Sequence, residues 1–158
     1  MKTVPMRRDD RLMSETETRE FLEKGEIGFL ATADEHGQPY VIGMNYGVID
    51  NTIYLHATLT GHKVDNIKAN PRVCFTVVDQ VEIIPERINT YYYSVVAFGQ
   101  ARLLYSGEEK ETALMDLVKK YSPMHDDCFA THDVTLVIAM DIEHLSGKKN
   151  PLPPGVSR

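Results

Sequence analysis

The chain has 158 residues, the length of one compact domain, and its hydrophobic (42%) and charged (25%) fractions are close to the averages of globular proteins. A formal net charge of −6 argues against a nucleic-acid partner, because phosphate backbones select proteins with clustered lysine and arginine. No stretch approaches the roughly 20 apolar residues of a membrane-spanning helix, and the N-terminal sequence lacks the apolar run of a secretory signal. We therefore expect one cytoplasmic domain at 1–150 with no membrane partner, followed by a proline-rich tail at 151–158.

Turn residues and apolar periodicity divide the chain into strands and a few short helices. A helix is predicted at about 14–24, where Ser14 and Glu17 have capping-box spacing, and a second capping box is predicted at Ser106 and Glu109 before another helix. A short crossover helix is expected between the third and fourth strands. The strands are expected at 27–33, 40–49, 53–57, 72–78, 91–105 and 134–142. Six strands with short peripheral helices favour a mainly β or α+β fold, an antiparallel barrel.

A few single residues carry predictions of their own. Gly99 lies inside a long strand pattern and predicts a bend or bulge there, while residues 80–92 fit no element clearly. Cys74 is expected in the core, since the two cysteines have neither zinc-site spacing nor partners for a disulfide framework. One polar loop contains His125, Asp126, Asp127 and His132. These side chains lack a fixed ligand spacing, and no metal site is predicted.

The most informative region is 39–63, where two paired strands lead into a glycine-containing turn and a helix start. A helix N-terminus presents unpaired N–H groups that favour an anion, and His62 and Lys63 add side-chain donors at that spot. The hydroxyls of Thr58 and Thr60 can add further donors for a phosphate group. Taken alone, this turn is a weak signal, because such a sequence is more often a solvated turn before a surface helix.

Several motifs follow one another in a recognisable order. They are MRRDDR at 6–11, FLAT at 29–32, GQPY at 37–40, YLHA at 54–57, GHK at 61–63, NPRVCF at 70–75, SVVAFGQAR at 94–102 and SGK at 146–148. Together they resemble the pyridoxamine phosphate oxidase-like flavoproteins, and within that family the nitroimidazole-resistance branch. Several matches in the right order are far more specific than any single one.

The resemblance implies a six-stranded antiparallel split β-barrel that acts as a homodimer, with FMN, or alternatively FAD, in each of two clefts at the subunit interface. By position, His62 and Lys63 match the basic pair that holds the FMN phosphate. The other cofactor-binding positions are Ile42, Gly43, Met44 and Asn45 beside the isoalloxazine ring, His56, Ala57 and Thr58 beside the ribityl chain, and Ser94 from the partner subunit. His62 stands where the oxidases have arginine. A histidine carries less positive charge than an arginine at neutral pH, so it is expected to attract the phosphate less strongly.

The implied activity is that of an FMN-dependent oxidoreductase that passes electrons from NAD(P)H to a small-molecule acceptor, such as a nitroimidazole or another nitroaromatic compound. His56 is then the candidate catalytic residue, although a histidine on a strand is also commonly structural. The proline-rich tail shows no match to the substrate-binding segment of the oxidases, so pyridoxine phosphate chemistry is not expected. The alternatives are a non-catalytic module for a flavin, another phosphate ligand or a tetrapyrrole, and a barrel that has lost its ligand.

Overall fold

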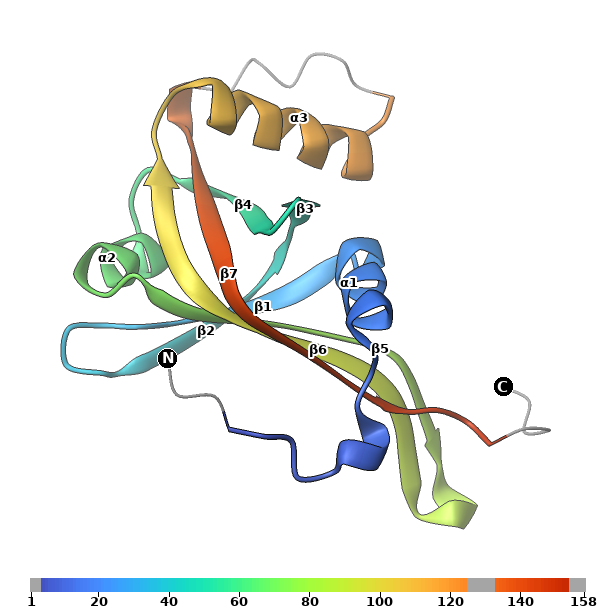
Figure 1. Ribbon diagram of the computed structural model, residues 1–158. Coiled ribbons are helices and arrows are strands. Elements are labelled where there is room, and N and C mark those ends of the chain that lie inside the picture. Colours follow the sequence, from blue (N-terminus) through green and yellow to red (C-terminus); the bar gives the residue numbers. More distant parts are fainter. Residues whose placement is uncertain (1–3, 125–132, 154–158) are drawn as a thin grey trace.

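The computed structural model describes residues 4–124 and 133–153, which form one curled antiparallel sheet with three α-helices around it (Figure 1). The helices are α1 (Glu15–Lys24), α2 (His62–Ala69) and α3 (Glu108–Tyr121), with short 3-10 turns at Asp9–Arg11 and Pro85–Arg87. The strands are β1 (Ile27–Ala33), β2 (Pro39–Asn45), β3 (Gly47–Ile49), β4 (Thr52–Thr58), β5 (Arg72–Ile84), β6 (Asn89–Leu104) and β7 (Thr135–Asn150). Their order across the sheet is β2-β1-β5-β6-β7-β4-β3, and the curled sheet confirms the predicted split barrel.

The sheet has seven strands rather than six, because the stretch expected as one strand at 40–49 is broken at Tyr46. The Tyr46 N–H donates to the Tyr121 hydroxyl at 3.0 Å, and that hydroxyl lies 2.8 Å from the Tyr46 carbonyl oxygen. Both backbone groups of Tyr46 are therefore used by a side chain of α3 instead of a neighbouring strand. As a result β2 pairs with β1 at one edge of the sheet, while β3 pairs with β4 at the other.

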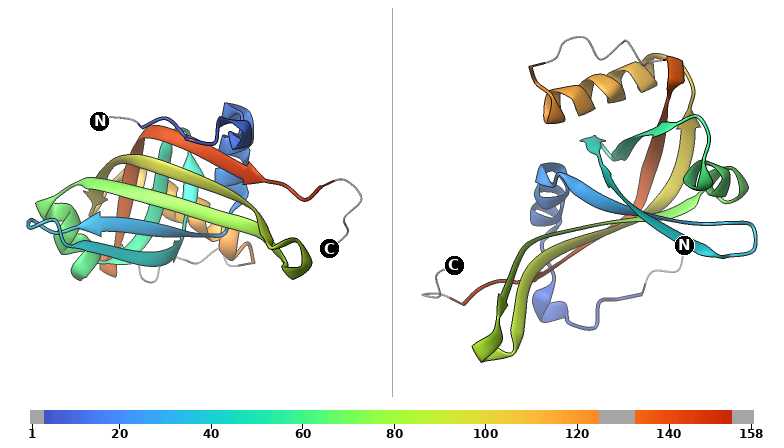
Figure 2. Two further views of the ribbon diagram at one scale, coloured as in Figure 1. Left: turned by 90° about the horizontal axis from the view of Figure 1, so that it is seen from below. Right: turned by 180° about the vertical axis from the view of Figure 1, so that it is seen from behind.

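The final strand is much longer than the predicted 134–142, because β7 continues to Asn150. The polar sequence after Ile142 does not resemble a strand, yet residues 144–150 pair with residues 92–98 of β6. The register shifts between Phe98 and Gly99, which confirms the bulge predicted at the glycine. This long pairing gives the sheet its strong curl, which is visible from two directions in Figure 2.

The first of the two predicted capping boxes is present and the second is not. In α1 the Ser14 hydroxyl accepts from the Glu17 N–H at 3.2 Å, and the Glu17 carboxylate accepts from the Ser14 N–H at 2.9 Å. Helix α3 begins after Gly107 without a side-chain cap, so the prediction for Ser106 was wrong. The carboxylate of Glu109 is instead bound by Arg102 on the sheet.

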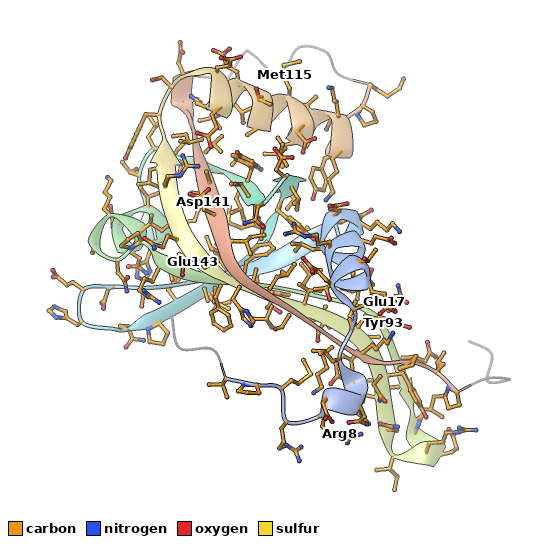
Figure 3. The ribbon with its side chains drawn as sticks, in the orientation of Figure 1. Arg8, Glu17, Tyr93, Met115, Asp141 and Glu143 are labelled. Atoms are coloured by element: carbon orange, nitrogen blue, oxygen red, sulfur yellow. The ribbon has the colours of Figure 1, made fainter. Side chains whose placement is uncertain are left out.

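This arginine ties α3 to the strands beneath it. Arg102 bonds Asp141 at 2.7 and 3.1 Å and Glu109 at 2.8 and 3.1 Å, and the Tyr54 hydroxyl donates to Glu109 at 3.1 Å. The guanidinium holds the pKa values of both carboxyl groups below their ordinary range. Figure 3 shows Asp141 on β7 below α3 and Met115 on the outer side of that helix. Because these groups are half exposed, the network contributes mainly to the placement of α3.

Alternate residues of the strands point into the barrel and form its main core, and a smaller cluster lies between the sheet and α3. The core contains Leu22, Leu30, Tyr46, Ile53, Leu55, Val64, Ile67, Phe75, Val77, Val95, Ala97, Leu136, Ile138 and Met140. The predicted burial of Cys74 was only half right, since it alternates with buried Val73 and Phe75 and lies on the outer face of β5. Partial burial of its thiol raises its pKa. None of the helices within 4–124 and 133–153 is long and apolar enough to span a membrane.

Residues 80–92, which fit no element from the sequence, form a two-stranded ribbon that projects beyond the barrel (Figures 1 and 2). A register shift between Asp79 and Glu82 bends β5 at the base of the ribbon. At its tip Ile88 has a left-handed backbone with φ of 49° and is 96% exposed. A β-branched residue rarely adopts this conformation, which costs roughly 1–2 kcal/mol in L-residues.

Replacing Ile88 with asparagine is expected to stabilise the protein by about 0.5–1 kcal/mol, because asparagine tolerates the left-handed conformation that isoleucine resists. Urea denaturation of the two proteins measures the difference. The matched control is Ile83→Asn on the same ribbon, which is 67% exposed but has no positive φ, and no gain is expected there. A loss of stability in the Ile88 variant would show that this side chain packs against another surface.

Candidate functional site

An open cavity of about 620 Å³ lies between the edge strand β2 and strand β4, with the first turn of α2 at its rim. Its lining consists of Ile27, Gly43, Met44, Asn45, His56, Ala57, Thr58, Lys63, Val134 and Thr135. The residues of this lining come from strands β1, β2, β4 and β7, from α2, and from Val134 just before β7. Most residues that the sequence resemblance assigns to a flavin site therefore meet around one cavity.

Three of the expected site residues do not line this cavity. The Ile42 side chain packs against the barrel core, so only its backbone could serve a ligand. The imidazole of His62 lies tilted against the ring of Tyr40. Ser94 lies on β6, on the far side of β1 and β5 from β2, where its hydroxyl donates to the Lys148 carbonyl at 3.5 Å. The resemblance places Ser94 in the site of a partner subunit, and this assignment stays a prediction.

Three lining residues were missed by the sequence reasoning. Ile27 lies directly opposite Asn45 in the β1–β2 hairpin, so the register of that hairpin could have identified it. Thr135 enters through the pairing of β7 with β4, in which it faces Thr58, and Val134 directly precedes that strand. Because these strands are far apart in the chain, no local pattern identifies them.

The wall formed by β2 offers backbone groups and an open surface. Since β2 lies at the edge of the sheet, alternate N–H and C=O groups on its free side lack a strand partner and can bond a ligand. Gly43 stands in the middle of this wall. A Cβ atom built there would approach only the Phe29 ring, at 3.5 and 3.7 Å, so the backbone is open to a flat ligand. Polar and apolar contacts are thereby combined, as is typical of cofactor sites.

The rim at α2 is the electropositive part of the cavity. The N–H groups of Val64 and Asp65 both donate to the Gly61 carbonyl, at 2.9 and 3.0 Å, which leaves the first two N–H groups of the helix pointing outward. Gly61 precedes the helix with φ of 130° and provides no side-chain cap. Among the described lining residues the ionisable side chains are His56 and Lys63, and none is acidic. The cavity is therefore suited to an anionic ligand.

One expected phosphate donor is already in use. The hydroxyl of Thr58 donates to the carbonyl of Thr60 at 2.8 Å and so shapes the turn before α2. In this arrangement the Thr58 hydroxyl is used by the turn, and its role as a phosphate donor stays a prediction. Thr58 still lines the cavity.

A second cavity, of about 810 Å³, is larger but less suited to a cofactor. It lies between residues 4–13, α1 and the outer side of β6 and β7. Its ionisable side chains carry both signs, and Arg19 already donates to the Asp50 carbonyl at 3.3 Å and to the Asn51 side chain at 2.9 Å. We therefore take the smaller cavity as the candidate site. It combines an open edge strand, a helix N-terminus and a lysine.

Metal binding finds no support in the described parts of the chain. Within 4–124 and 133–153, no group of three or more histidine, cysteine, aspartate or glutamate side chains is placed to hold a metal ion. The polar loop with His125, Asp126, Asp127 and His132 lies outside the described residues.

Solved structures of several proteins share this fold. A candidate 5-nitroimidazole antibiotic resistance protein from Bacteroides thetaiotaomicron is 22% identical, with a TM-score of 0.74 over 87% of this chain and 85% of that one. A conserved hypothetical protein from Mycobacterium tuberculosis is 24% identical, with a TM-score of 0.78 over 97% and 99%. An FAD-binding protein from Mesorhizobium loti is 25% identical, with a TM-score of 0.68 over 89% and 97%.

The family assignment comes from the sequence as a whole. No curated protein matches the chain. The sequence model of the pyridoxamine 5'-phosphate oxidase family, however, matches residues 14–149, which include every helix and strand that contributes to the candidate site. This match agrees with the resemblance of the short motifs and with the split-barrel structure. The chain belongs to the pyridoxamine 5'-phosphate oxidase family.

Proposed function

We propose that the protein is an FMN-binding oxidoreductase that uses electrons from NAD(P)H to reduce a small acceptor, such as a nitroimidazole or another nitroaromatic compound. The observation that carries the proposal is the single cavity that joins the open β2 backbone, the end of β4 and Lys63. The FAD-binding protein from Mesorhizobium loti and the candidate nitroimidazole resistance protein give independent support for a flavin and for this class of acceptor. FAD is the alternative cofactor.

The residues present suit a flavin at each part of the cavity. The backbone of β2 at Gly43, Met44 and Asn45 would bond the polar edge of the isoalloxazine ring, and the open face of Gly43 would let the ring approach closely. Lys63 and the free N–H groups of α2 would hold the phosphate. When bound, the flavin accepts a hydride and passes on one or two electrons, so the protein mainly positions and shields it.

His56 is the proposed catalytic residue. It lies on β4 opposite Val137, its side chain is exposed, and it lines the cavity beside Ala57 and Thr58. An imidazole in this place can orient an acceptor by a hydrogen bond and give it a proton as electrons arrive. Lys63, the other ionisable group in the described lining, is assigned to the phosphate.

A second copy of the chain would complete the site. The cavity is open, and large apolar side chains lie exposed on the neighbouring outer face of β1, β2 and β5, namely Ile27, Phe29, Val41 and Val78. Burying such a surface in a symmetric dimer is favourable, and ligand sites commonly form at interfaces. We therefore propose a homodimer, located in the cytoplasm with its NAD(P)H, in which Ser94 of the second copy reaches the flavin.

A non-catalytic flavin carrier is the second candidate. It is favoured by the small number of proton-transfer groups around the cavity, since His56 is the only described lining residue suited to that role. The two functions differ in turnover. A carrier would retain its flavin but show no steady-state oxidation of NADH or NADPH in the presence of a nitroaromatic acceptor.

The first test is an absorbance spectrum of the purified protein, followed by release of the chromophore and its chromatographic identification. A flavin spectrum with released FMN, together with acceptor-dependent oxidation of NADH or NADPH, is the expected result. A bound flavin without oxidation would favour the carrier. A colourless protein that fails to bind added FMN or FAD would overturn the proposal.

Replacing Lys63 with alanine is expected to weaken FMN binding by roughly 10- to 100-fold, because a hydrogen bond to a charged group contributes about 1.5–3 kcal/mol. Fluorescence titration of the apoprotein with FMN measures the affinity. Lys68→Ala is the matched control, since it removes the same charge from the exposed C-terminal end of α2. Equal affinities in the two variants would remove Lys63 from the site.

A further inference from the structure

Tyr40 contacts the first residue of α2. Its ring lies against the imidazole of His62, with ring centroids 4.2 Å apart and planes inclined by 36°. Tyr40 belongs to β2 and His62 begins α2. This contact joins the two elements that border the cavity at its flat wall and at its rim.

Helix α2 is held to the barrel through its inward-facing side chains, whereas His62 at its start is exposed. The helix has eight residues, and isolated helices of this length are unstable in water. Its anchors are Val64 in the first turn and Ile67 in the second, both in the core, and the Asn66 side chain, which donates to Thr32 at 3.0 Å. Gly61 provides no side-chain cap at the start of the helix. Within the described part of the chain, the ring of Tyr40 is the contact that holds the His62 side chain in place.

The distance along β2 gives this contact a role in binding. Tyr40 precedes Gly43 by three residues, which in a strand is about 10 Å. One strand therefore carries both the wall for the flavin ring and the contact that fixes the helix at the phosphate end. A site whose two parts are held at a constant separation binds with a smaller ordering cost.

We propose that Tyr40 is a positioning residue for the phosphate end of the flavin site, acting through its ring contact with His62. The inference rests on the proposed function, because it concerns the same cavity. It assigns to His62, whose ring does not line the cavity, the role of the contact through which β2 holds the start of α2. A ring at position 40 is required, and the Tyr40 hydroxyl is not.

The test compares FMN with riboflavin, which has the same ring and no phosphate, in titrations of the wild-type protein and of two variants. In Tyr40→Leu we expect FMN affinity to fall roughly 2- to 10-fold, in line with the strength of an aromatic pair, while riboflavin affinity is unchanged. In Tyr40→Phe both affinities should match the wild type. Thermal melts of all three apoproteins check that the fold is intact.

A double variant locates the effect. If Tyr40 acts through His62, then adding Tyr40→Leu to His62→Ala should cause no further loss of FMN affinity. Equal losses for FMN and riboflavin, no loss at all, or additive losses in the double variant would each overturn the inference. Failure of the wild-type protein to bind either flavin would instead overturn the proposed function, and the role of Tyr40 with it.

Discussion

Replacing Gly43 with valine is expected to abolish flavin binding and leave the barrel folded. Gly43 lies in the open wall of the cavity, where an added Cβ makes only ordinary contacts with the Phe29 ring. The two methyl groups of valine would extend into the space in front of the β2 backbone. A rigid planar ring cannot repack around them, and its affinity should fall by roughly 100-fold or more.

The measurement is a titration with FMN combined with a thermal melt. The melting temperature should change little, because valine suits a strand and a Cβ atom at this position approaches no backbone atom. Gly43→Ala is the graded control, with a smaller loss of affinity. Normal FMN affinity in the valine variant would show that the ring does not lie against β2, and the candidate site would have to be abandoned.

Replacing Gly99 with alanine is expected to have the opposite outcome, a large loss of stability. A Cβ at Gly99 would lie 2.0 Å from the Asp141 carbonyl oxygen and 3.0 Å from its carbonyl carbon. Both are backbone atoms of the paired strand β7, so the clash can be relieved only by moving a strand at the bulge. We expect the free energy of unfolding to fall by about 3 kcal/mol or more.

Denaturation by urea measures this loss, and Gly43→Ala again serves as the control, because the same substitution there meets no close neighbour. If the free energy of unfolding of the Gly99 variant fell by less than about 1 kcal/mol, the β6–β7 bulge would have to deform far more easily than expected for two long paired strands. Loss of flavin binding in this variant would follow from loss of the fold and would say nothing about the site.

Much of the fold could be predicted from local signals. The helix at 14–24 has a capping box whose two partners are three residues apart, and hairpins such as β1–β2 are closed by a short turn. Features that depend on distant residues could not. The strand break at Tyr46 is caused by Tyr121, 75 residues away, and the final strand extends through polar residues because β6 lies ready to pair with them.

The candidate site likewise has a part that could be predicted from local motifs and a part that could not. Its residues on β2, β4 and α2 were predicted because they lie in short motifs whose order resembles a known family. Side-chain directions were not predictable, since they depend on contacts between elements. The Thr58 hydroxyl donates to Thr60, and the His62 ring lies against Tyr40. Sequence motifs identified the main chain of the site better than the orientation of its side chains.

The position of β7 between β6 and β4 has a consequence for how the protein folds. Strands β2, β1, β5 and β6 can pair with one another as soon as residue 104 has been synthesised, but the β3–β4 hairpin can join them only through residues 135–141 of β7. Such non-local pairing is slow, and the edge of β4 that pairs with β7 stays open in the meantime. Because the cavity needs β4 as its second wall, a flavin would bind only after the last strand has docked. The cofactor would then stabilise the completed barrel by mass action and draw late intermediates toward it.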